Sequence, residues 1–133
     1  MKKIYRMLAV LTGIMIFYFS NQPANISSMQ SDFIYKLLGI DLQSMGIEIR
    51  KVAHFTIYFI LGFFLALSRK RLGKQQISEN ILLIFLFAIS DEFHQSFIPG
   101  RGPSFKDVLI DTSGAMTSTL LIYSLKKIKI WGH

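Results

Sequence analysis

Residues 51–71 read KVAHFTIYFILGFFLALSRKR. An apolar run fills most of this stretch, and the basic cluster Arg69-Lys70-Arg71 follows it directly. A helix needs about 20 residues to cross the hydrocarbon core of a bilayer, and basic flanks are typical of the cytoplasmic side. The stretch therefore predicts a membrane-spanning helix that begins at a polar end carrying Lys51 and His54 and ends in the cytoplasm.

The whole chain has the composition of a membrane protein. Hydrophobic residues make up 51% of its 133 residues and charged residues 17%, whereas soluble proteins average roughly 25% charged residues. The net charge of +7 comes from basic clusters beside apolar runs, not from a basic stripe interleaved with aromatic residues. Nucleic-acid binding is therefore not expected. The absence of cysteine excludes disulfides and thiolate chemistry.

Four apolar segments predict a single-domain, all-α integral membrane bundle. The expected spans are approximately 4–20, 51–68, 80–98 and 105–125, with an outer loop at 21–50. Hydropathy supports the third span in part and the fourth weakly. With both termini in the cytoplasm, however, most Lys and Arg residues fall on the inner side, as the positive-inside rule requires. Residues 1–19 also resemble a signal peptide but lack a convincing cleavage site, so we predict a retained span.

The outer loop contains one further expected helix. At residues 32–38, Ile34, Leu37 and Leu38 share one helical face. This pattern fits a short helix that lies at the membrane interface, or a packed lid over the bundle.

Acidic and polar side chains gather at the non-cytoplasmic end in this topology. An ionised side chain within the membrane costs at least about 2.5 kcal/mol, so a set of them aligned in depth on several helices points to function. Helical spacing groups them into three faces beneath a loop that carries Arg101: Lys51, His54 and Tyr58 on the second span, Asp91, Glu92 and Gln95 on the third, and Asp107 and Asp111 on the fourth.

Small residues extend two of these faces toward the cytoplasm. Gly62 follows on the second span, and Gly114 and Ser118 follow on the fourth. Small side chains allow membrane helices to approach closely. Both faces therefore permit close approach to a neighbouring helix.

The polar faces permit two kinds of chemistry. Lys51, His54 and Arg101 suit the binding of a phosphate or carboxylate. Glu92, Asp107 and His54 are candidate general acids or bases, and Tyr58, Gln95 and Asp111 are further candidate ligand-binding residues. Each residue also has a structural explanation, such as an ion pair that only holds helices together. His54 and His94 match no established metal-ligand spacing, so neither a metal nor another cofactor is predicted.

Three ordered motifs resemble the VanZ-like family. They are KVAHFTIYFILG at 51–62, DEFHQSFIPGR at 91–101 and DVLIDTSGA at 107–115, preceded by YFSNQP at 18–23. The positions that match the family are Lys51, His54, Tyr58, Glu92, Gln95, Arg101, Asp107 and Asp111. The chain departs from the family at Asp111, where Asn is usual, and at Ile57, where an acid is frequent. His94 lies outside the match.

The resemblance implies a multi-pass protein of the bacterial cytoplasmic membrane, in a family associated with resistance to the glycopeptide teicoplanin. Together with the polar faces, it leads us to expect a pocket that binds or modifies the anionic headgroup of a lipid or lipid-linked cell-wall precursor. Two other classes stay open: a small proton-coupled transporter, and a tetraspan partner protein whose charges are structural.

Overall fold

The computed structural model describes residues 2–21, 24–39, 49–100, 102 and 104–131. In these ranges every regular element is an α-helix, which confirms the all-α class. The helices are α1 (Lys2–Ser20), α2 (Ala24–Leu38), α3 (Ile49–Ser68), α4 (Lys74–Gln95) and α5 (Phe105–Trp131). Relative to the expected spans, α4 begins earlier, at Lys74, and α5 continues further, to Trp131.

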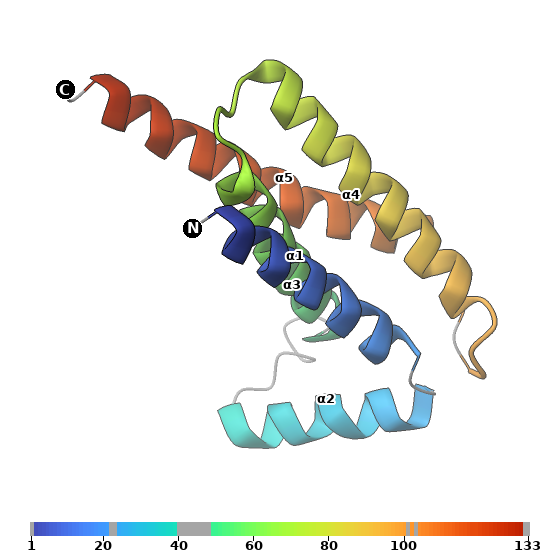
Figure 1. The fold of residues 1–133 in the computed structure, drawn as a ribbon. Helices are drawn as coiled ribbons and strands as arrows, with labels where there is room; N and C mark the ends of the chain where they lie inside the picture. The colour runs from blue at the N-terminus through green and yellow to red at the C-terminus, as the bar shows by residue number, and fades with distance from the viewer. Residues whose placement is uncertain (1, 22–23, 40–48, 101, 103, 132–133) are drawn as a thin grey trace.

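The four long helices form a bundle in which α3 is central. α3 packs most extensively against α5 and also against α1, while α4 lies along α5 (Figure 1). The chain reverses direction between these helices, so the ends of α1 and α4 lie at the same end of the bundle as the starts of α3 and α5 (Figure 1). This arrangement brings the polar faces to one end.

Glycines allow α3 and α5 to approach each other closely. A Cβ atom added to Gly62 would lie 2.7 Å from the carbonyl oxygen of Ala115 and 2.5 Å from the Ser118 hydroxyl. A Cβ atom added to Gly114 would collide with the backbone carbonyl of Phe55. The small residues that permit close helix approach thus lie where α3 and α5 meet.

The bundle exposes apolar side chains and buries polar ones. Val10, Ile14 and Leu82 are each more than half exposed, whereas Asn80 and Asp91 are completely buried. A water-soluble bundle shows the opposite distribution. An apolar exterior is instead what lipid, the solvent of a membrane protein, requires.

Three helices have the length and composition needed to cross a membrane. They are Lys2–Ser20, Arg50–Ser68 and Phe105–Lys129. α4 is not among them, because it carries Lys74 and Glu79 near its start and Asp91 and Glu92 near its end. The chain is thus a helical membrane protein, while the count of four spans and the cytoplasmic position of both termini stay predictions.

The hydroxyl groups of α5 explain how so polar a helix fits an apolar solvent. Thr112, Ser113, Thr117 and Ser124 each donate a hydrogen bond to the carbonyl oxygen four residues earlier, at 2.6 to 2.9 Å. Such bonds satisfy the hydroxyl within its own helix. These residues therefore lower the hydropathy of α5 without needing partners on other helices.

α2 occupies the predicted outer loop and is longer than expected. It begins at Ala24 and lies across the polar end of the bundle (Figure 1). Met29, Phe33 and Leu37 recur every four residues and are each at least 66% exposed. An exposed apolar stripe on a helix at this position fits the predicted interfacial helix.

Candidate functional site

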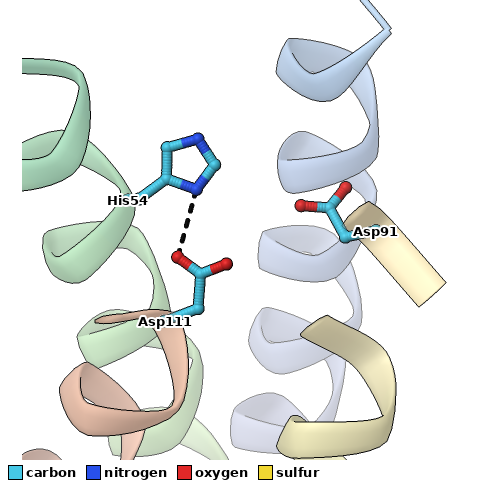
Figure 2. A group of neighbouring side chains, drawn as sticks. All are labelled: His54, Asp91 and Asp111. Carbon is cyan, nitrogen blue, oxygen red and sulfur yellow. Dashed lines mark hydrogen bonds and ion pairs between the residues drawn. The ribbon is translucent and has the colours of Figure 1, made fainter. Parts of the chain in front are cut away.

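The site is centred on a pair formed between α3 and α5. The imidazole Nδ1 of His54 lies 3.1 Å from Oδ1 of Asp111 (Figure 2). The Asp111 side chain is completely buried, and the His54 side chain is 19% exposed. The carboxylate is thus shielded inside the bundle, and the imidazole is the member of the pair that can be reached from outside.

α4 brings a second carboxylate to the pair. Asp91 is completely buried, and its Oδ2 accepts a hydrogen bond of 3.3 Å from the hydroxyl of Tyr58, one turn below His54 on α3. Figure 2 shows the carboxylate of Asp91 directed toward the pair formed by His54 and Asp111. Ligand atoms of His54, Asp91 and Asp111 all lie within 4.8 Å of one another, so these three residues are able to hold a metal ion.

Glu92 connects α4 to the start of α5. Its Oε2 accepts a hydrogen bond of 2.9 Å from the backbone N–H of Ser104, immediately before α5. Asp107 lies half-buried in the first turn of α5, where the helix dipole favours an acidic side chain. Glu92 is thus held at the rim of the buried cluster.

Gln95 joins α1 to the site. Its amide Nε2 donates a hydrogen bond of 3.2 Å to the hydroxyl of Ser20, and both side chains are buried. Ser20 was not among the predicted site residues. It belongs to the YFSNQP motif, and that membership was the only signal in the sequence that could have found it.

The predicted residues do not all meet. His54, Tyr58 and Asp111 form the centre with Asp91, while Glu92 and Gln95 flank it. Lys51 is exposed at the start of α3, and Arg101 lies outside the described residues. His94 packs against the ring of Phe17, with centroids 5.7 Å apart.

Several buried oxygens of the site lack hydrogen-bond partners among the described residues. They are Oδ1 of Asp91, Oδ2 of Asp111 and Oε1 of Glu92. A buried polar atom without a partner typically costs about 1–3 kcal/mol, and more when it is charged. The described centre therefore has an excess of carboxylate oxygens over donors, and it can accept a cation or a hydrogen-bond donor.

The opposite end of the bundle is basic and internally bonded. The guanidinium of Arg69 forms an ion pair of 3.1 Å with Glu79 and donates a bond of 3.1 Å to the side chain of Asn80. The ammonium of Lys126 donates bonds to the carbonyls of Ala66 and Arg69, at 3.3 and 2.9 Å, at the end of α3. The buried carboxylates and the basic cluster thus lie at opposite ends.

Comparison with known families agrees with the motif positions. The VanZ/LLP1 family matches residues 5–127, which include every residue of the site. No curated protein and no solved structure matches the chain. The family match covers nearly the entire length and coincides with the helices that build the polar end, and the chain therefore belongs to the VanZ-like family of membrane proteins.

Proposed function

We propose that this protein binds the anionic headgroup of a membrane lipid or lipid-linked cell-wall precursor at its polar end, in the outer leaflet of the bacterial cytoplasmic membrane. The observation that carries this proposal is the convergence of polar side chains from α1, α3, α4 and α5 inside a bundle whose exterior is apolar. Their burial costs free energy, and binding of a polar ligand offsets that cost.

The position of the cluster at one end of the bundle favours a ligand that enters from the membrane surface. His54 is the partly exposed member of the central pair, and α2 lies across this end with an exposed apolar stripe (Figure 1). A headgroup still attached to its acyl chains can reach such a site while the chains stay in the bilayer. The family's association with teicoplanin supports a precursor or lipid of the cell envelope as the ligand.

Charge sets a condition on this binding. The buried centre carries Asp91 and Asp111 beside a single histidine, so an anion brought directly to it would be repelled. The basic candidates, Lys51 and Arg101, are assigned to the headgroup on sequence grounds. The anionic part of the ligand would have to face them, or a cation at the centre.

Lipid identification by mass spectrometry tests the proposal. The full chain is purified in native-like membrane patches as the wild type and as the variants Glu92→Gln, Lys51→Met and Glu79→Gln. Glu79 is the matched control, because it is an acid on α4 at the opposite end. We expect one phospholipid or lipid-linked precursor class to be enriched over bulk membrane, and this enrichment to fall in the first two variants only.

A change in teicoplanin susceptibility should accompany that loss. Cells that express wild-type protein and the Glu79→Gln variant should respond alike, whereas Glu92→Gln at equal expression should behave as cells without the protein. Equal lipid enrichment and equal susceptibility in all variants would refute the proposed pocket. Loss of folding in Glu92→Gln, with lipid enrichment unchanged in Lys51→Met, would favour a structural role for the charges.

A proton-coupled carrier is the second candidate function, because polar side chains continue below the cluster. Ser118, Thr119 and Asn80 are completely buried, and Asn80 contacts Arg69 at the basic end. Together with Asp111 they extend polar groups through the bundle interior. Ion or proton flux in proteoliposomes that disappears in Asp111→Asn would favour this function, and flux equal to that of empty liposomes would exclude it.

A further inference from the structure

We infer that His54, Asp91 and Asp111 form a binding site for a divalent transition-metal cation such as Zn²⁺ or Mn²⁺. The residues come from α3, α4 and α5, and their ligand atoms lie within 4.8 Å of one another. One imidazole nitrogen and two carboxylate oxygens are a donor set that these cations accept. From the sequence, His54 and His94 with nearby acids matched no established ligand spacing, and no metal was predicted.

The unpartnered oxygens are an independent indication of a ligand. Oδ1 of Asp91 and Oδ2 of Asp111 have no hydrogen-bond partner among the described residues, although both side chains are completely buried. Figure 2 shows these carboxylates directed toward the space that the three residues share. Two neighbouring buried carboxylates repel each other when both are ionised, and a divalent cation between them removes both the repulsion and the missing contacts.

The distances suit coordination after small side-chain rotations. With metal–ligand bonds of about 2.0–2.2 Å, two ligand atoms at a tetrahedral angle lie about 3.3 Å apart. Nδ1 of His54 and Oδ1 of Asp111 are already 3.1 Å apart. The other separations, up to 4.8 Å, must shorten by up to about 1.5 Å, and the last torsion of aspartate and histidine side chains has a broad range.

The surroundings supply support and access. The hydroxyl of Tyr58 donates to Oδ2 of Asp91, and a bond of this kind orients a carboxylate ligand. His54 is 19% exposed, which gives the cation a path. Three protein ligands leave at least one position open for water or for a ligand oxygen.

The role of this cation in binding a headgroup rests on the proposed function and deepens it. A divalent cation would reverse the charge of the acidic centre, so the phosphate of a headgroup could occupy the open position. The metal site itself depends only on the three side chains.

Metal content of the purified full chain tests the inference. Protein in nanodiscs is stripped with a chelator, incubated with Zn²⁺ or Mn²⁺, desalted and analysed by elemental mass spectrometry. We expect about one ion per chain in the wild type and in the control Glu79→Gln. Changes outside the first coordination shell already weaken metal binding about 10–100-fold, so Asp91→Asn, Asp111→Asn and His54→Gln should each weaken it at least about tenfold.

Pulsed electron paramagnetic resonance of the Mn²⁺-loaded wild type makes the test independent of variant folding. A coupling from a directly bound ¹⁴N nucleus is expected, because His54 supplies the only nitrogen ligand of the three. A wild type that retains no metal, or metal retained equally in all three ligand variants, would overturn the inference.

The lipid measurement separates this inference from the proposed function. Headgroup enrichment that persists in chelator-treated protein would overturn the bridging role of the cation while leaving headgroup binding intact. Bound metal without any lipid enrichment would support the metal site and refute the proposed function.

Discussion

Gly62→Ala is the substitution whose effect the structure defines most closely. The added Cβ atom would lie 2.7 Å from the carbonyl oxygen and 2.8 Å from the Cα atom of Ala115. Ordinary van der Waals contact begins near 3.4 Å. The Ser118 hydroxyl, at 2.5 Å, can rotate away. The two Ala115 atoms belong to the backbone of α5 and cannot, so the separation of α3 and α5 must grow locally by about 0.7 Å (3.4 − 2.7 Å).

This displacement reaches the site through α3. Gly62 and His54 lie about two turns apart on the same helix, and Nδ1 of His54 is 3.1 Å from Oδ1 of Asp111 on α5. If the full 0.7 Å is transmitted, this distance becomes about 3.8 Å, which is too long for a hydrogen bond. We expect overpacking to destabilise the bundle by about 1–3 kcal/mol and the lipid enrichment to fall with it.

Gly13→Ala is the matched control. A Cβ atom on Gly13 of α1 would lie 3.6 Å from the ring of Phe87, which is ordinary contact. Replacing glycine by alanine inside a helix gains up to about 1 kcal/mol, so this variant should be as stable as the wild type or more stable. Reversible unfolding in mixed micelles measures both variants. Equal stability of Gly62→Ala and Gly13→Ala, with unchanged lipid enrichment, would show that α3 and α5 tolerate a methyl group between them and that their spacing does not control the site.

Three further substitutions test single contacts. Tyr58→Phe removes the hydroxyl that donates to Asp91 and leaves a buried carboxylate without that donor. Unfolding in micelles should show that the free energy of unfolding falls by about 1–3 kcal/mol. Unchanged stability would mean that the bond contributes nothing. Ser20→Ala removes the hydroxyl of α1 that accepts from Gln95 and also interacts with Asp91, both on α4. The same assay should show a loss of at least about 0.6 kcal/mol, the average for one such bond between membrane helices; no loss would mean that these contacts do not hold α1 to α4. Lys126→Met removes the cation that binds the last carbonyl groups of α3. We expect the free energy of unfolding to fall by about 0.3–1 kcal/mol and amide exchange at residues 66–69 to become faster. Unaltered exchange there would mean that Lys126 does not cap α3.

Helical periodicity explains why much of the site could be predicted. Spacing alone fixes which residues share a face, so His54 and Tyr58 on α3, and Asp107 and Asp111 on α5, could be grouped without a structure. Gly62 and Gly114 on these faces indicated that both permit close approach to a neighbouring helix. The pairing of His54 with Asp111 comes from the structure, because spacing does not decide which helices meet.

The rotation of α4 could not be predicted in the same way. Asp91, Glu92 and Gln95 span an arc of roughly 100°, and spacing does not decide which of them faces which neighbour. In the structure, Asp91 is hydrogen-bonded to Tyr58, Glu92 to the backbone of Ser104 and Gln95 to Ser20. Each of these contacts depends on the packing of another helix, and packing is a property of the whole bundle.

Two other differences between the prediction and the structure lie at the ends of helices. Lys51 shares a face with His54 and Tyr58 but lies in the first turn of α3 and is exposed, because a helical face extends beyond the residues that its neighbours cover. The earlier start of α2, at Ala24, has a signal in Pro23 of the sequence, since proline is favoured where helices begin. The polar composition of residues 24–31 concealed this signal.

The distribution of unsatisfied groups in the bundle bears on where a ligand acts. At the basic end, Nδ2 of Asn80 has no partner among the described residues. Arg69 and Lys126, however, find acceptors on Glu79, Asn80 and the end of α3, so a ligand of these cations would have to compete with bonds already formed. At the acidic end, oxygens of Asp91, Glu92 and Asp111 have no partner among the described residues. A ligand that binds only the folded protein stabilises it in proportion to the logarithm of its concentration relative to Kd. A missing contact lowers the stability of the free protein, and a ligand that forms this contact raises the stability of the complex. The acidic end, where carboxylate oxygens lack partners, therefore has the most free energy to gain from binding.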